Sequence, residues 1–430
     1  MSARTAVAIT GLGAATPLGA DASTFRAGLL EGRHGFGPVS RFDATRYGVN
    51  WAGQLDDAVW APPGSPDAGS RPAQLLDRVA AEALAMAGGP NDTRTALVLG
   101  TTLGSDELSR VAWQEQHGHA PDYDTVLSGM ADCAGRRLVD RLALGGPVWS
   151  VVTACAAGTT AIGVGADLIR LGLVDRVLAG GVDTLTELIY AGFDSMGALG
   201  HDCRPFAEDR EGVVLAEGAA MIVLESEGHA RGRGAHIQAW VLGCGTANDA
   251  YHATAPHPDG RGAALAMQRC LSDAGLSPAD IDYVNAHGTG THANDPAEWA
   301  AIAAVLGSHA WEIPVSSTKS QMGHALSAAG AIEAVATVLA LRDGFVPPTA
   351  HRHAPLAAAV GADFVQDAGR RRPMACALSN SFAFGGHTAC LALGRADIDW
   401  NSERSGGHPA LRSPSPDPTR HRGVRAAHSR

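Results

Sequence analysis

The feature that most constrains the fold of this chain is the regular alternation of short apolar runs with helical stretches rich in small residues. Strands that alternate with helices favour parallel sheets whose faces are covered by those helices. The sequence therefore predicts an α/β protein. The expected strands lie at 5–10, 96–99, 148–153, 176–179, 219–224, 283–285, 313–316 and 375–378, and the expected helices at 73–87, 156–171, 262–273, 296–306 and 328–342.

One pattern occurs in both halves of the chain: an apolar run, a turn with polar residues of catalytic type, and a helix of small residues. Residues 150–171 show it first, and residues 315–342 show it again. Both helices contain glycine, which costs about 1 kcal/mol relative to alanine inside a helix. We therefore expect the two helices to approach closely at the centre of the molecule, between two similar halves stacked face to face.

The overall composition argues against several classes of protein. The chain is 45% hydrophobic and 18% charged, as globular proteins are, and its net charge of −11 makes nucleic acid an unexpected partner. No signal-peptide core follows Met1 and no apolar run reaches about 18 residues, so we expect a cytoplasmic protein without a membrane segment. The seven cysteines lack zinc-binding spacing, and no metal is expected.

A single lysine, Lys319, stands among 32 arginines. Lysine carries a compact, strongly hydrated charge, so this position is expected to need an ammonium that a guanidinium cannot replace. The alternative is a surface lysine that survived by chance. An SxxK acyl-transferase motif needs a KTG companion, which a chain with one lysine cannot contain. A Schiff-base lysine stays a minor alternative, because no phosphate-binding glycine loop lies beside it.

Cys155 is the candidate nucleophile. It lies between an apolar run and a helix, and residues 156–158 are small enough to admit a bulky acyl group. A helix N-terminus favours the thiolate and can lower the pKa of a thiol. The alternative is a small buried hydrophobe, which is the usual role of a free cysteine.

Two histidines and two glycine-rich segments complete the local signals. His287 and His324 lie beside glycines at the ends of apolar runs, which suits general acid–base or oxyanion roles. Residues 380–386 are expected to form a glycine-rich loop whose N–H groups could line an anion hole. Residues 11–16 resemble the dinucleotide-binding motif but lack its third glycine and its acidic partner, so we expect a structural turn there.

Together these segments closely resemble the β-ketoacyl-[acyl-carrier-protein] synthases, and among them the elongating type of type II fatty-acid and polyketide systems. The resemblance runs from residue 4 to residue 394, and the joint order and spacing of the motifs make it specific. The matching motifs are Thr153-Ala154-Cys155, residues 285–291, residues 317–324 and residues 380–386, supported by residues 204–212 and 215–219.

The resemblance implies a thiolase fold, in which two related βαβαβαββ halves form a five-layered αβαβα core. Residues 1–247 would form the half that carries the nucleophile, and residues 248–396 the half that carries both catalytic histidines. Residues 397–430 have no apolar period and are expected to be a disordered, basic tail, inert or attracted to acidic partners.

The resemblance also implies a set of site residues. Cys155, His287 and His324 would form a catalytic triad, and a buried Lys319–Glu333 pair would serve the His324 side. The remaining expectations are Phe384 as a gate, Thr289 and Thr291 as pantetheine contacts, Phe193 and Leu103 as pocket wall, and Asn285, Ser379, Asn380 and Glu333 as a structural cation site seen in some members.

The implied reaction is a decarboxylative Claisen condensation of malonyl-ACP (ACP, acyl carrier protein) with an acyl chain held on Cys155. It needs no cofactor beyond the phosphopantetheine of the ACP. The expected partners are the ACP and a second subunit, in a homodimer or in a heterodimer with a chain-length factor.

Ala383 and His387 depart from the usual family loop Gly-Phe-Gly-Gly-Thr-Asn. They favour a type II polyketide system, including the polyene type, over a housekeeping fatty-acid enzyme. A non-catalytic partner resembling a chain-length factor is the distant alternative, since such partners typically lack the nucleophile.

Overall fold

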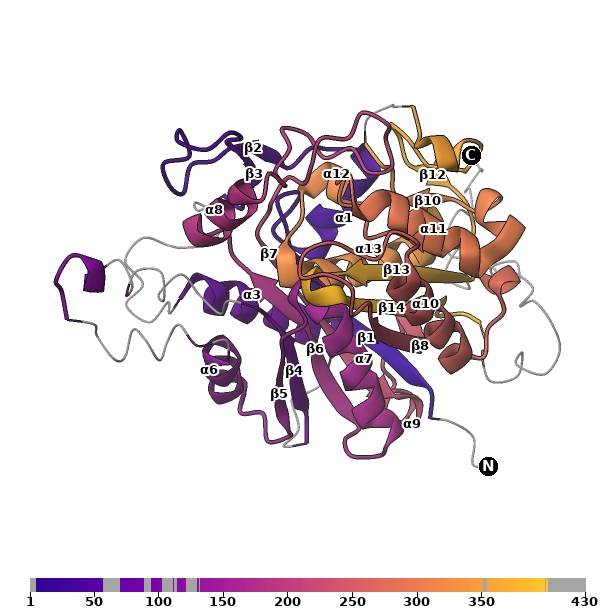
Figure 1. The fold of residues 1–430 in the computed structure, drawn as a ribbon. Coiled ribbons are helices and arrows are strands. Elements are labelled where there is room, and N and C mark those ends of the chain that lie inside the picture. Colours follow the sequence, from indigo (N-terminus) through magenta and orange to yellow (C-terminus); the bar gives the residue numbers. More distant parts are fainter. Residues whose placement is uncertain are drawn as a thin grey trace, which may run out of the picture.

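The computed structural model describes residues 5–56, 70–88, 94–102, 111, 114–120, 130, 132–350, 354–398 and 400 (Figure 1). Its centre is a sheet with the strand order β10-β9-β13-β14-β8-β1-β7-β6-β4-β5. These strands are β1 (Val7–Ala15), β4 (Ala96–Gly100), β5 (Val148–Val151), β6 (Arg176–Asp183), β7 (Gly218–Ser226), β8 (Ala239–Asn248), β9 (Tyr283–Asn285), β10 (Val315–Ser316), β13 (Cys376–Phe382) and β14 (His387–Arg395).

The sheet consists of two halves that hydrogen-bond to each other only where β1 meets β8 in the described residues. Helices α7 (Ala157–Arg170) and α13 (Ala329–Asp343) contact strands of both halves and lie between them (Figure 1). Helices α3 (Arg71–Ala87) and α6 (Cys133–Leu142) cover the N-terminal half on its other side. On the C-terminal half, α10 (Arg261–Ala274) packs on β8 and β14, and α11 (Asn294–Leu306) packs on α10. The five-layered prediction is confirmed.

The element order repeats in the two halves. Apart from shorter elements inserted between them, the elements follow the order β1-α3-β4-α6-β5-α7-β6-β7 in the first half and β8-α10-β9-α11-β10-α13-β13-β14 in the second, which is the predicted βαβαβαββ pattern. Pairing is mixed, because β1, β7, β8 and β14 run antiparallel to their neighbours. The expected parallel pairing is therefore present in part of the sheet, at β10-β9-β13 and at β6-β4-β5, and β8 and β14 were not among the expected strands.

The described residues do not test the predicted domain boundaries or the predicted tail. The boundaries at 247 and 396 stay predictions, and the described residues include little of the tail beyond Ile398. Among the described residues, no helix is both long and apolar enough to cross a bilayer.

Gly11 and Gly13 do not form the expected turn, because β1 continues through both of them. A Cβ at Gly11 would lie 2.0 Å from the carbonyl oxygen of Ala83, and one at Gly13 would lie 2.0 Å from that of Val79. Both carbonyls belong to α3, which crosses directly over the strand. Glycine is required here for close helix–strand packing and not for a change of chain direction.

The predicted close approach of the two central helices is confirmed. A Cβ at Gly158 of α7 would lie 2.7 Å from the backbone nitrogen of Ala331 in α13. A Cβ at Gly330 of α13 would lie 2.1 Å from the Oγ1 of Thr159 in α7. Each helix therefore uses a glycine to admit the other, and this contact brings the turns that precede the two helices close together.

Those two turns have the same local geometry. A 3₁₀ turn, η1 (Ala154–Ala156), precedes α7, and another, η4 (Leu326–Ala328), precedes α13. The first residue of each turn has a left-handed φ, 46° at Ala154 and 52° at Leu326, which is uncommon for residues other than glycine. Cys155 and Ser327 occupy equivalent second positions in these turns.

Candidate active site

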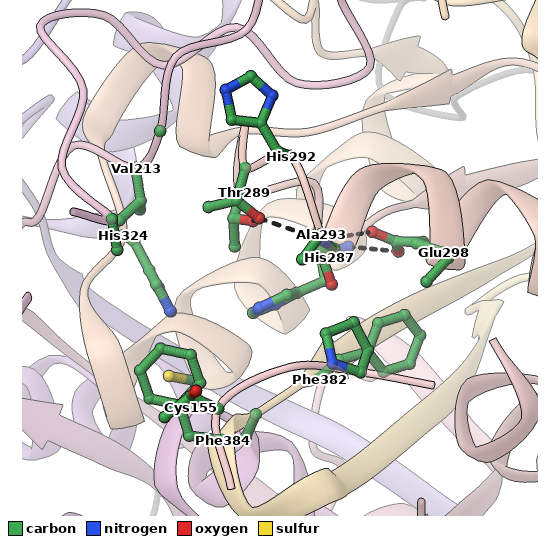
Figure 2. A pocket seen from close by; sticks show the side chains of 18 of the residues that line it. Cys155, Val213, His287, Thr289, His292, Ala293, Glu298, His324, Phe382 and Phe384 are labelled. Atoms are coloured by element: carbon green, nitrogen blue, oxygen red, sulfur yellow. Dashed lines mark hydrogen bonds between the residues drawn. The ribbon is translucent and has the colours of Figure 1, made fainter. Parts of the chain in front are cut away.

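A cavity of about 260 Å³ is lined by Cys155, His287 and His324. In Figure 2 the thiol and the two imidazole rings face one another across the same space. The imidazole ring centroids are 5.2 Å apart and their planes are nearly perpendicular, at 87°. The fold thus brings together the three residues of the predicted triad, which lie on segments far apart in the sequence.

Cys155 is 9% exposed and lies in η1, immediately before α7. Burial raises the pKa of its thiol to about 12, the nearby Lys319 charge lowers it, and the Asp183 charge raises it further. The expectation that the helix N-terminus would favour a resting thiolate was therefore wrong. Removal from water disfavours the charged form by more than the Lys319 charge restores. Cys155 is a thiol that must lose its proton as it reacts.

His287 follows β9 and is nearly fully buried. Its Nδ1 accepts a hydrogen bond from the Nζ of Lys319 at 3.2 Å. An ammonium can only donate, so the proton of the neutral ring is on Nε2. Burial, followed by the Lys319 charge and His324, lowers the pKa of His287 well below its usual value. The ring is therefore neutral and can offer an N–H group to a developing negative charge.

His324 is held by its backbone. Its N–H donates to the carbonyl of Val214 at 2.7 Å, and its carbonyl accepts from the N–H of Ala216 at 2.8 Å. Burial, followed by the Lys319 charge, lowers the pKa of His324 well below its usual value. The imidazoles of His287 and His324 are therefore both neutral near pH 7.

Lys319 opens the short helix α12 (Lys319–Met322) and is fully buried. The chance surface lysine is therefore excluded. Its ammonium forms an ion pair with Glu333 of α13, as expected, but its other hydrogen bond goes to His287 and not to His324. The hydrogen bond of the pair thus goes to His287, while the Lys319 charge acts on both histidines and lowers the pKa of each. Lys319 does not line the cavity, which disfavours a Schiff-base role.

Glu298 of α11 also lines the cavity and was missed by the sequence analysis. Its carboxylate accepts the backbone N–H groups of His287 at 2.8 Å and of Gly288 at 2.7 Å, which sets the shape of the loop after β9. Burial raises the pKa of Glu298 to about 7. A glutamate within the alanine-rich helix 297–305 is the signal that could have indicated it.

The other predicted residues surround the cavity. The hydroxyls of Thr289 and Thr291 lie 2.9 Å apart, and Phe193 of α8 (Glu187–Ser195) stacks on Phe384 with ring centroids 5.5 Å apart. All four residues line the cavity. Leu103 lies outside the described residues.

The glycine-rich loop is shorter than expected, because β13 continues to Phe382. Gly385 and Gly386 both have a φ of 76°, which favours glycine, whereas Ala383 is extended at −145°. Ala383 therefore fits without strain.

The expected cation site is only partly assembled. Within the described residues, the Oδ1 of Asn285, the Oγ of Ser379 and the Oε2 of Glu333 are buried and have no hydrogen-bond partner. Buried oxygens of this kind suit a hard cation, which would join β9, β13 and α13 without taking part in the reaction. The Oδ1 of Asn380 is also buried without a hydrogen-bond partner, but its side chain lies on the other face of the sheet. Successive strand residues point to opposite faces, and its amide reaches Glu298 at 3.4 Å.

Comparisons with known proteins agree with this geometry. The profile described as "Beta-ketoacyl synthase, N-terminal domain" matches residues 4–230, and that described as "Beta-ketoacyl synthase, C-terminal domain" matches residues 238–353. A 3-oxoacyl-[acyl-carrier-protein] synthase 2 from Synechocystis sp. is 39% identical, over 90% of this chain and 97% of that protein.

Two solved structures are similar along nearly their whole length. The ishigamide ketosynthase/chain length factor superposes with a TM-score of 0.86 at 35% identity, over 91% of this chain and 100% of that chain. A type II polyketide ketosynthase, solved with its acyl-carrier protein and bound to the hexaketide, superposes with a TM-score of 0.84 at 29% identity, over 92% of this chain and 100% of that chain. This chain belongs to the β-ketoacyl synthase family.

Proposed function

We propose that this β-ketoacyl-ACP synthase elongates acyl chains held on Cys155 by decarboxylative condensation with malonyl-ACP. One observation carries the proposal: the cavity presents the buried thiol of Cys155 to the neutral imidazoles of His287 and His324. A thiol alone would support acyl transfer, and N–H donors alone would support enolate formation. Their combination suits an enzyme that performs both steps in sequence.

The first step is transfer of the acyl group. The sulfur of Cys155 attacks the carbonyl carbon of an acyl-ACP thioester, and the pantetheine sulfur leaves and takes the thiol proton. The raised pKa of Cys155 requires the proton to leave as the sulfur attacks. The backbone N–H groups of Cys155 and Phe384 are proposed to bind the carbonyl oxygen, and Thr289 and Thr291 to hold the pantetheine arm.

The second step uses the histidines. Malonyl-ACP loses carbon dioxide, and the electron pair of the broken carbon–carbon bond forms an enolate. The enolate oxygen accepts hydrogen bonds from the N–H groups of His287 and His324. The enolate carbon then attacks the acyl group on Cys155. The carbon–sulfur bond breaks, the thiolate of Cys155 takes up a proton, and a 3-oxoacyl chain two carbons longer leaves on the ACP.

Within this family we propose a type II polyketide role, including the polyene type. Ala383 and His387 support it, since both depart from the usual family loop. Alanine has fewer accessible backbone conformations than glycine, so Ala383, which is extended, restricts the loop that carries Phe384. A housekeeping fatty-acid enzyme is the alternative, favoured by the similarity to the synthase of Synechocystis. The non-catalytic partner is disfavoured, because Cys155 and both histidines lie together.

The proposed partners are an ACP and a second subunit, either a second copy or a chain-length factor. Strand β5 lies at one end of the sheet, and its Val148 and Trp149 are 43% and 48% exposed. An open strand edge with apolar side chains is suited to pairing with another subunit. Native mass spectrometry of the co-purified complex would distinguish two identical chains from two different ones. The cytoplasmic location stays a prediction.

The reaction is tested by incubating the protein with an acyl-ACP and identifying the acylated residue by mass spectrometry. We expect the acyl group on Cys155 and none on the Cys155→Ala variant; acylation of another residue would refute the assignment. Release of carbon dioxide from malonyl-ACP is then measured in His287→Ala and His324→Ala. Unchanged release in both variants would remove the proposed role of the histidines.

A further inference from the structure

Asp183 is a buried carboxylate that the proposed mechanism does not use. It is the last residue of β6 and is 3% exposed. Burial raises its pKa to about 6, while hydrogen bonds from Ser327, Thr102 and Thr101 lower it. Burying a carboxylate costs free energy unless hydrogen bonds compensate, so the partners of Asp183 indicate what the residue does.

Those partners come from both halves of the molecule. The Oδ2 of Asp183 accepts the backbone N–H of Ser327 at 2.8 Å, and its Oδ1 accepts the hydroxyl of Thr101 at 3.3 Å. Thr101 follows β4 in the N-terminal half, whereas Ser327 lies in η4 of the C-terminal half. The carboxylate therefore joins the half that carries Cys155 to the turn that follows His324.

The packing around Ser327 fixes the same turn from its other side. A Cβ at Gly158 of α7 would lie 2.8 Å from the carbonyl oxygen of Ser327, and a Cβ at Gly181 of β6 would lie 2.9 Å from it. The carbonyl of Ser327 thus lies against two glycines of the N-terminal half while its N–H is bound by Asp183. The turn η4 therefore packs against the N-terminal half, although its residues belong to the C-terminal half of the sequence.

His324 lies three residues before Ser327. Backbone hydrogen bonds with Val214 and Ala216 fix His324 itself, and the hydrogen bond from the N–H of Ser327 to Asp183 fixes the residues that follow it. Leu326, between them, has a φ of 52°, an uncommon conformation that persists only where the surroundings enforce it. We propose that Asp183 is a positioning residue that fixes His324 relative to Cys155 by binding the N–H of Ser327.

This proposal rests on the proposed function for its catalytic consequence, but its structural part can be tested without activity. Asp183→Ala removes the acceptor, and Asp183→Asn keeps an oxygen that can accept from Ser327 while its amide can donate to Thr101. If Asp183→Ala does not fold, Asp183→Ser, whose hydroxyl is shorter by one atom, replaces it. Ser327→Ala keeps the backbone N–H but removes the hydrogen bond that the Ser327 side chain makes to Asp183, so it measures the side-chain contribution separately.

Two measurements test the positioning role of Asp183. In hydrogen exchange followed by mass spectrometry, Asp183→Ala is expected to speed exchange at least tenfold in peptides covering 324–331, and Asp183→Asn less than threefold. In carbon dioxide release from malonyl-ACP, Asp183→Ala is expected to lower kcat at least tenfold with KM changed less than threefold, and Asp183→Asn to restore most of kcat.

The outcomes separate the two proposals. Unchanged exchange in Asp183→Ala, or loss of kcat as large in Asp183→Asn as in Asp183→Ala, would overturn the positioning role. A wild-type protein that releases no carbon dioxide would refute the proposed function and leave the exchange result to judge Asp183.

Discussion

The turn that precedes α7 and the turn that precedes α13 share one geometry but have different contents. From β5, which ends at Val151, the chain reaches α7 at Ala157 through little more than η1. From β10, which ends at Ser316, the chain reaches α13 only at Ala329, after the extra helix α12 and the loop of His324. The short connection carries the thiol, and the long one carries Lys319 and His324.

The difference shows how two copies of one supersecondary pattern can divide a reaction between them. The short connection leaves Cys155 at the helix start, where the small residues of α7 leave room for a substrate. The longer connection has room for a buried ammonium, which pairs within its own half, and for His324, whose backbone is hydrogen-bonded to the other half. Because Gly158 and Gly330 let the two helices touch, both sets of groups meet in one cavity.

The division of roles between the two turns is tested most directly by replacing each of the equivalent residues Cys155 and Ser327 with alanine. Cys155→Ala is expected to lower the elongation rate on the order of a thousandfold or more, because no other group can hold the acyl chain. Ser327→Ala is expected to lower it less than tenfold. Steady-state elongation with purified ACP substrates is the measurement, and an equal loss in both variants would contradict the division of roles.

The ionisation of the thiol at the start of α7 is the next test. With a pKa raised to about 12, the thiolate fraction of Cys155 rises about tenfold per pH unit through the neutral and weakly alkaline range. Alkylation of Cys155 by iodoacetamide, followed by peptide mass spectrometry, should climb in the same way without levelling off. A peptide of the same sequence should level off near the usual thiol pKa of about 8.5. A plateau below that value in the folded protein would show a stabilised thiolate.

The connection between β10 and α13 is tested by substituting its buried lysine, Lys319. Lys319→Arg is expected to lower carbon dioxide release about 100-fold, because a planar guanidinium cannot replace a compact ammonium between Glu333 and His287. Arg342→Lys, an exchange in the opposite direction at the exposed C-terminal end of α13, is the matched control and should change it little. Near-normal release by Lys319→Arg would show that the position needs only a positive charge.

The contact between the two helices gives the smallest expected effect. Gly158→Ala and Gly330→Ala should each lower the free energy of unfolding by about 1–3 kcal/mol, because the added Cβ has no room. Gly228→Ala in α9 (Glu227–Gly232) faces open space and should be neutral or stabilising by less than about 1 kcal/mol. Denaturant unfolding measures all three, and equal stability of the three variants would mean that the helices can separate at no cost.

Much of the fold could be predicted because it depends on local pattern. The five expected helices match α3, α7, α10, α11 and α13 to within a few residues, whereas α6 and α12 were not among them. The glycines in α7 and α13 indicated their contact. The missed strands β8 and β14 contain glycine and cysteine between their apolar residues, which weakens the strand signal. Gly11 and Gly13 were assigned to a turn because the atoms that require glycine there belong to α3, about seventy residues later in the chain.

The site divides in the same way. The types and order of Cys155, His287 and His324 were readable in the sequence, since each stands beside small residues at the end of an apolar run. The hydrogen bond from Lys319 to His287, the role of Glu298 and the protonation of Cys155 were not readable. Hydrogen-bond partners and pKa values depend on distance through space and on removal from water, and both are decided only when the two halves close on each other.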